Sequence, residues 1–411
     1  MYYGGHFKRG SFMLTVSFTQ DIEFGRTEVH LSGVDTPIFW QWDIAGAFKP
    51  AALPTADFAA LAALPYALHS KQDLHIKGAV SKMLLIHLEE TVMLWHQWCP
   101  EKFPRLRISC DSIAGAPSNV THDKAVIAFS GGVDSTYALA VNMDEASPLL
   151  DRHGRADIGL AVFVLGFDYK LTDTKGYNAL FKNNEIICGR YDVPLMEVRT
   201  NYRDVLTPRG LDWDYFHTLA TSAVLHQMSG HFRHGVLAAD QTYPDDMFIM
   251  PSAANSSSNQ MLKSDIFCLR THGIDTLRGQ KVKFLADCNL ADLVNVCWKG
   301  PRTGTNCGKC EKCIRTMLMM ESYAIDPTVA FGSRLTVAKI FTVLFKKQIS
   351  RHFIKLIVRD WQNGALALKT AARVNLMLSP FVPVTLVKQV MRIRRMLVRS
   401  GGEISIRRTV L

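Results

Sequence analysis

The sequence predicts an α/β fold whose central part is a doubly wound parallel sheet. Between residues 123 and 330, four short apolar runs of strand length alternate with stretches of helical length. The composition, 48% hydrophobic and 20% charged, is typical of a folded chain and excludes an extended disordered one. At 411 residues the chain has room for two or three domains.

Residues 1–122 are predicted to form a separate N-terminal α+β module. Alternating apolar and polar residues at 14–18 and 27–31 indicate strands, and apolar residues repeat at helical spacing from about residue 80 to 98. The run Gly-Ala-Pro-Ser-Asn at 115–119 is typical of a linker, and we place the end of the module there.

The alternation of strands and helices begins at Lys124. Because each strand is followed by a helix, the strands are expected to pair in parallel. The predicted strands cover residues 125–129, 158–165, 195–198 and 235–239. One helix is predicted to begin near residue 136, and two further helices to cover residues 177–190 and 213–228.

The C-terminal residues 331–411 are predicted to be a basic helical extension. From Ser333 onward there are 16 Lys and Arg and 2 acidic residues, a net charge of +14, so the rest of the chain carries −4 of the total of +10. This charge favours an acidic partner: nucleic acid first, an acidic protein second and an anionic membrane surface third. The alternative is packing against the body with a solvated basic face.

Three features favour a cytoplasmic protein. No apolar signal segment follows Met1. The longest nearly uncharged runs, at 51–68 and 374–387, are broken by prolines, and the first also contains Asp57, so no transmembrane segment is expected. The nine cysteines, in a chain without a secretory signal, are expected to be reduced thiols.

A phosphate-binding loop is the strongest motif of the sequence. The predicted strand 125–129 runs directly into glycines and serines and then into a helix. Glycines allow backbone N–H groups to converge, and the start of the helix adds unpaired N–H donors and the positive end of its dipole. The alternative is a glycine-rich turn that contains serines by chance. The predicted loop consists of Ser130, Gly131, Gly132, Val133, Asp134 and Ser135.

A second motif is a cluster of four cysteines with the spacing Cys-x9-Cys-x2-Cys-x2-Cys. Short Cys-x2-Cys spacings bring two thiolates to one ion, and four thiolates complete a tetrahedral Zn²⁺ shell. An iron–sulfur cluster uses the same ligands, although the compact knuckle favours zinc. A catalytic thiol is a further alternative, but zinc bound to all four would leave no thiol free. The four residues are Cys297, Cys307, Cys310 and Cys313.

The loop resembles the Ser-Gly-Gly-x-Asp-Ser signature of the PP-loop superfamily, the N-type ATP pyrophosphatases. The resemblance implies an adenine nucleotide alpha hydrolase-like (HUP) fold, with ATP as substrate. It also implies that the loop holds the β and γ phosphates, so that attack falls on the α phosphate. AMP is then transferred and pyrophosphate released, and Asp134 would contact the Mg²⁺–pyrophosphate group.

A PP-loop followed about 160 residues later by a four-cysteine knuckle resembles 7-cyano-7-deazaguanine synthase and its relatives. This resemblance covers residues 123–325. It implies adenylylation of a deazapurine-type carboxylate, displacement of AMP by ammonia or another amine, and dehydration of the amide to a nitrile. Larger synthase-like proteins of this group occur in bacterial anti-phage systems. The N-terminal module and the basic extension have no counterpart in the biosynthetic enzyme.

Three further residues are candidates for the site. Asp168 follows the second strand of the predicted parallel sheet, where ligands bind, and is a candidate contact for ribose or adenine. Arg278 and Lys281 precede the cysteines and are candidates to neutralise charge on the α phosphate. The alternatives are a solvated loop residue for Asp168 and a solvated helix face for the two cations. A polar stretch at 251–259 is predicted to be a loop suited to substrate contact.

Two other functions remain open from the sequence. The first is RNA thiolation through an adenylylated base, which the basic extension favours and a cysteine cluster filled by zinc disfavours. The second is a nucleotide-sensing interaction module without catalysis, which an intact Ser-Gly-Gly-Val-Asp-Ser disfavours.

Overall fold

The computed structural model describes residues 13–43, 51–115, 123–145, 147, 154–247, 252–297, 303–336, 338–340 and 357. The chain divides into two compact units, Met1–Cys307 and Gly308–Leu411. The strands are β1 (Met13–Asp21), β2 (Arg26–Leu31), β3 (Ile38–Trp42), β4 (Asp73–Ser81), β5 (Ile108–Ala114), β6 (Ala125–Ala128), β7 (Ile158–Leu165), β8 (Leu195–Thr200), β9 (His234–Ala238) and β10 (Cys268–His272).

From β6 to β10, one or more helices separate each strand of the first unit from the next. Short 3₁₀ turns follow α5 at Thr207–Arg209 and α8 at Gln260–Leu262. The helices are α1 (Asp57–Ser70), α2 (Lys82–Trp98), α3 (Val133–Met143), α4 (Thr174–Gly189), α5 (Tyr202–Leu206), α6 (Trp213–His226), α7 (Tyr243–Asp246), α8 (Ser256–Asn259) and α9 (Arg278–Asp287).

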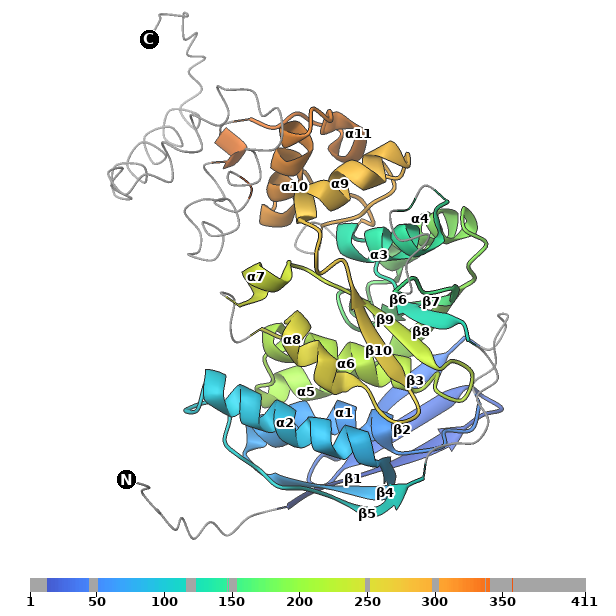
Figure 1. Ribbon diagram of the computed structural model, residues 1–411, viewed down its shortest axis with the longest axis vertical. Helices are drawn as coiled ribbons and strands as arrows, with labels where there is room; N and C mark the ends of the chain where they lie inside the picture. The colour runs from blue at the N-terminus through green and yellow to red at the C-terminus, as the bar shows by residue number, and fades with distance from the viewer. Residues whose placement is uncertain are drawn as a thin grey trace, which may run out of the picture. The chain divides into compact units, whose positions relative to one another are not determined.

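One ten-stranded sheet, in the order β10-β9-β6-β7-β8-β3-β2-β1-β4-β5, runs through the first unit (Figure 1). From β10 to β8 all neighbouring strands are parallel. The chain moves outward from β6 to β7 and β8, and then returns to the other side of β6 with β9 and β10. The strand order therefore reverses beside β6, and ligands of open α/β sheets bind at the carboxyl end of such a reversal.

The central strands are buried on both faces, as expected of a doubly wound sheet. Along β7, Leu160 and Val162 belong to a large core that includes α1 and α6. Phe163 and Leu165, at odd-numbered positions of the strand, pack instead with α4, and the Phe163 ring stacks on Tyr177 with centroids 4.6 Å apart. Since side chains alternate between the faces of a strand, helices cover both sides of β7 (Figure 1).

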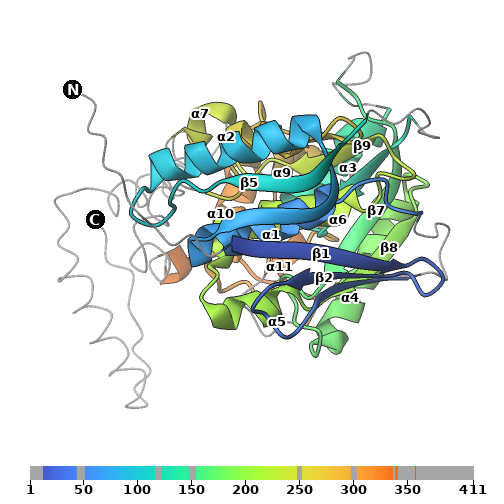
Figure 2. The ribbon, with the colours of Figure 1, turned by 90° about the horizontal axis from the view of Figure 1, so that it is seen from below.

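The described N-terminal residues belong to the same sheet. We expected residues 1–122 to form a separate module. Instead β3 pairs antiparallel with β8, with Trp40 opposite Thr200, so that β1–β5 extend the parallel part. Helix α2 runs alongside β5 (Figure 2). The pairing places Trp40 and Trp42 in the common core, where the Trp42 indole donates to Gln227 Oε1 of the chain after α6.

The α/β class and the parallel pairing of the central strands are confirmed, and β7 has the predicted bounds. The other three central strands and their helices begin or end within a few residues of the prediction. Strands β3, β4, β5 and β10 and helix α1 were not predicted. The predicted linker falls mostly on residues 116–119, outside the described part of the chain.

In the second unit, the described elements are α10 (Glu311–Ser322), α11 (Thr328–Phe331) and a helical turn at 338–340. Almost all of the predicted basic extension at 331–411 lies outside the described residues. None of the helices that the structure describes has the length and apolar character needed to cross a membrane.

Candidate functional site

The predicted phosphate loop connects β6 to α3, at the carboxyl end of the strand beside which the sheet order reverses. The Ser130 and Ser135 hydroxyls lie 3.1 Å apart, and the backbone N–H of Ser130 donates to Ser135 Oγ. Gly132 is the N-cap residue of α3, and its carbonyl accepts the N–H of Thr136. The first-turn N–H groups of α3 therefore have no acceptor within the helix.

Gly131 is a position that only glycine fits. Its φ of +71° lies in the left-handed region, and a Cβ built there would come within 1.9 Å of the Asn184 Oδ1 atom. Its carbonyl accepts the backbone N–H of Asn295 at 2.8 Å. The loop is thus enclosed by two residues that lie far from it in the sequence.

Asp134, in the first turn of α3, is paired with both predicted cations. Arg278 Nη1 donates to Asp134 Oδ2, and Lys281 Nζ lies 3.6 Å from Asp134 Oδ1. Arg278 and Lys281 are in the first two turns of α9, and α3 packs against α9. Arg278 Nε and Asp134 Oδ1 are buried and have no hydrogen-bond partner among the described residues. The three charged groups therefore form one cluster beside the loop.

Lys281 is fully buried rather than on a solvated helix face. Its ammonium donates to the carbonyl of Ala239, which follows β9, at 2.6 Å. Burial lowers the pKa of Lys281 below its usual value, while the Asp134 carboxylate opposes that shift. Lys281 thereby connects the chain segments that follow β6 and β9, the two strands at the reversal.

Asp168 is not brought into this cluster. It is exposed, three residues beyond the end of β7, and no hydrogen bond or ion pair between described residues joins it to the loop. The predicted polar loop at 251–259 differs from expectation too. Its described part contains α8, and Asn255 and Ser256 are buried and hydrogen-bonded to Asp246. The Asn255 side chain and the Ser256 backbone N–H are therefore used within the fold.

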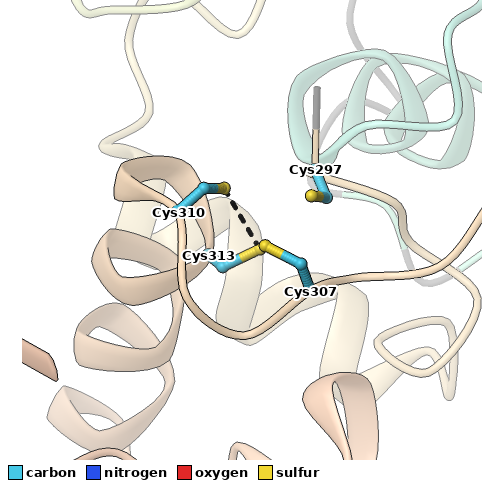
Figure 3. Close-up of side chains that lie close together, drawn as sticks. All are labelled: Cys297, Cys307, Cys310 and Cys313. Carbon is cyan, nitrogen blue, oxygen red and sulfur yellow. Dashed lines mark hydrogen bonds between the residues drawn. The ribbon is translucent and has the colours of Figure 1, made fainter. Parts of the chain in front are cut away.

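The four predicted cysteines lie together, and their sulfur atoms are all within 4.8 Å of one another. Figure 3 shows the four side chains converging, with the Cys310 and Cys313 sulfurs 3.4 Å apart. In a tetrahedral Zn²⁺ site with bonds of about 2.3 Å, sulfurs are roughly 3.8 Å apart. Small side-chain movements would reach that spacing, so the cluster can hold a metal ion.

The local fold explains why the cysteines meet. Cys310 is the N-cap of α10, and Cys313 is buried within its first turn. Gly308 has a φ of +60°, which lets the chain turn between Cys307 and Cys310. On the other side, the Asn306 side chain accepts the N–H of Val296 and donates to the carbonyl of Val294, which fixes the segment that carries Cys297.

Asn184 and Asn295 were not predicted, although both contact the loop. The Asn295 Oδ1 atom accepts the N–H of Cys297 at 2.9 Å, so this residue connects the cysteine segment to Gly131. Asn184 lies within α4, and no motif surrounds it. Only the folded chain brings either side chain to the glycines. Comparison with known protein families, curated proteins and solved structures found no match to this chain.

Proposed function

We propose that this protein is an enzyme of the PP-loop ATP pyrophosphatase type, with the corresponding adenine nucleotide alpha hydrolase-like (HUP) fold. It adenylylates a carboxylate of a deazapurine-type acid with ATP. Ammonia or another amine then displaces AMP, so the net reaction is carbon–nitrogen ligation.

One observation carries this proposal. The Ser130–Ser135 loop lies at the carboxyl end of β6, beside the strand-order reversal, and the buried cluster of Asp134, Arg278 and Lys281 lies next to it. The loop offers first-turn N–H groups and two hydroxyls, which suit phosphate oxygens. No lysine of the P-loop kinase kind is present in the loop. The resemblance to the PP-loop signature supports binding of the β and γ phosphates, which leaves the α phosphate open to attack.

In the proposed reaction, a substrate carboxylate oxygen forms a bond to the α phosphorus. The bond from the α phosphorus to the oxygen bridging to the β phosphorus breaks, and pyrophosphate leaves. The amine nitrogen then attacks the acyl carbon, AMP leaves with the electron pair of the carbon–oxygen bond, and the amine loses a proton to solvent. Negative charge builds up on the phosphates in the first step, and preorganised cations stabilise it.

The residues present fit these roles. Arg278 has an unpartnered Nε donor, and Lys281 is held in place by Ala239. Asp134 keeps one buried carboxylate oxygen, Oδ1, without a hydrogen bond, and this oxygen is a suitable ligand for Mg²⁺. Mg²⁺ bound there would neutralise charge on the departing pyrophosphate. The cysteine cluster, with Zn²⁺ bound, would serve as a scaffold for the chain that holds Gly131.

Product analysis tests the proposal. The purified protein is incubated with ATP, Mg²⁺, an ammonium salt and a panel of deazapurine carboxylic acids, and the nucleotides are separated by chromatography. We expect AMP and pyrophosphate in equal amounts with at least one acid. Release of ADP and orthophosphate would refute attack at the α phosphate. Tight ATP binding with no pyrophosphate from any acid would favour the nucleotide-sensing alternative.

A further inference from the structure

Two buried asparagine side chains beside the loop carry N–H donors that have no hydrogen-bond partner among the described residues. Asn184 is 0% exposed, and neither its Oδ1 nor its Nδ2 has a partner among the described residues. Asn295 is 9% exposed, and its Nδ2 is likewise without a partner within the described chain. Buried amides are nearly always hydrogen-bonded, because their desolvation is otherwise uncompensated. Two unpartnered Nδ2 donors on residues that contact one loop indicate a ligand whose oxygens accept from them.

Both carboxamides belong to residues that contact Gly131, and Asn295 also lies beside Gly132. The Asn184 Oδ1 atom lies where a Cβ of Gly131 would be, and Asn295 donates its backbone N–H to the Gly131 carbonyl. The Asn295 carbonyl would lie 3.6 Å from a Cβ at Gly132. The Asn184 Nδ2 donor would lie 3.2 Å from a Cβ at Gly131, and the backbone of Asn295 lies against both glycines. Both residues are therefore at the loop backbone, where the proposed function places the outer phosphates.

We propose that the side chains of Asn184 and Asn295 are further ligands of the pyrophosphate group bound by the Ser130–Ser135 loop. This inference rests on the proposed function and adds two residues from outside the motif. The loop N–H groups and hydroxyls supply donors for one phosphoryl group. The two carboxamides supply donors for a second, without adding charge next to Arg278 and Lys281.

The chain contains a matched control for the missing hydrogen bonds. Asn142, within α3, is also 0% exposed, but its carboxamide is fully partnered. Its Nδ2 donates to the Ala138 carbonyl and to His272 Nδ1, at 2.6 and 2.7 Å, and its Oδ1 accepts the N–H of Ala156 at 2.7 Å. Asn142 thus shows how this fold satisfies a buried carboxamide that serves structure alone.

Thermal unfolding of the ligand-free protein tests whether the Asn184 side chain lacks a hydrogen-bond partner within the protein. Asn184→Leu replaces an unpartnered amide by an apolar group of similar size, so the Tm should stay the same or rise. Asn142→Leu breaks three hydrogen bonds, so the Tm should fall by several degrees. A comparable fall for Asn184→Leu would mean that Asn184 has a protein partner, and this would overturn the inference.

Titration calorimetry with inorganic pyrophosphate and Mg²⁺ tests the binding role. Asn184→Asp and Asn295→Asp keep the side-chain shape but replace the N–H donors with a negative oxygen. The carboxylate introduced by Asn295→Asp can still accept the Cys297 N–H. Each should weaken binding by roughly tenfold to a hundredfold, and Asn184→Leu by about tenfold. Asn142→Leu, assayed below its Tm, should bind as the wild type does.

The outcomes separate this inference from the function on which it rests. If the wild type binds pyrophosphate and the Asn184 and Asn295 variants bind it equally well, the carboxamides are not ligands, although the loop assignment stands. If the wild type does not bind pyrophosphate at all, both the inference and the proposed function fail.

Discussion

The backbone N–H of Asn295 donates to the carbonyl of Gly131 at 2.8 Å, which fixes the turn of the Ser130–Ser135 loop from a segment 164 residues further along the chain. The side chain of the same Asn295 accepts the N–H of Cys297, one of the four clustered cysteines. Asn295 therefore connects the loop to the cysteine cluster. We expect metal binding by the cysteines to affect ligand binding at the loop.

Metal removal should weaken phosphate binding. We expect one Zn²⁺ per chain by elemental analysis, without labile sulfide. Because the metal would hold Cys297 and thereby Asn295, chelation or Cys313→Ser should lower the Tm and reduce pyrophosphate affinity several-fold. Cys110→Ser, in the edge strand β5 and outside the cluster, is the control and should change neither. Loss of metal with unchanged pyrophosphate affinity would contradict this connection.

Gly131→Ala should disable the loop. The substitution places a Cβ at a φ of +71° and within 1.9 Å of Asn184 Oδ1. We expect a loss of stability of about 1–3 kcal/mol and loss of pyrophosphate binding. Gly189→Ala, at the end of α4, has a negative φ and no neighbour within 4 Å of the new Cβ. Gly189→Ala should leave the free energy of unfolding, measured with urea, unchanged. If both substitutions changed stability equally, Gly131 would not lie in an enclosed turn.

Asp134→Asn should destabilise the fold as well as abolish catalysis. It would leave the buried cations of Arg278 and Lys281 without their counter-charge, which costs about 3–5 kcal/mol. The exposed pair of Lys283 and Asp287 on the same helix provides the control. Asp287→Asn should cost less than about 1 kcal/mol in the same urea titration. Similar losses of unfolding free energy in the two variants would contradict a buried, mutually dependent cluster of Asp134, Arg278 and Lys281.

Stability should fall on acidification because of His272. Burial lowers the pKa of His272 to about 4, from an ordinary value near 6.5, and its Nδ1 accepts from Asn142. Between pH 6.5 and 4 the unfolded chain takes up a proton that the folded chain does not. The free energy of unfolding therefore decreases over this window, by about 3 kcal/mol from this residue.

Urea unfolding at pH 7 and pH 4.5 measures this effect. His272→Gln, which keeps an acceptor for Asn142, should show a smaller decrease than the wild type between the two pH values. The buried His226, whose pKa burial also lowers, stays in both proteins and contributes equally. An identical decrease in wild type and variant would contradict a neutral buried His272.

The parts of the fold that the sequence predicts are those with local patterns. Strand β7 is an unbroken apolar run because both of its faces are buried. Helix α1 was not predicted because nearly all its residues are buried, so no polar face creates a helical period. Strand β10 was not predicted because it contains the polar residues Arg270, Thr271 and His272, which interrupt the apolar pattern expected of a buried strand.

Long-range pairing explains the remaining differences. Nothing near Trp40 in the sequence indicates that it lies opposite Thr200 in the sheet, although this pairing joins the N-terminal strands to the parallel part. In the candidate site, the loop and the cysteines were found from their spacing. Asn184 and Asn295 have no motif. They are identified only by their buried Nδ2 donors, which lack partners among the described residues, and this is a property of the folded chain.

A structure of the protein with Mg²⁺ and an ATP analogue carrying a methylene group between the α and β phosphorus atoms is the most direct test of the proposed attack at the α phosphate. We expect the β and γ phosphates to contact the backbone N–H groups of residues 131–135. We also expect the α phosphate to remain open to a substrate and to face Arg278 or Lys281. A triphosphate bound away from the loop, or one with its α phosphate enclosed by the loop and its γ phosphate in solvent, would refute this mode of ATP binding.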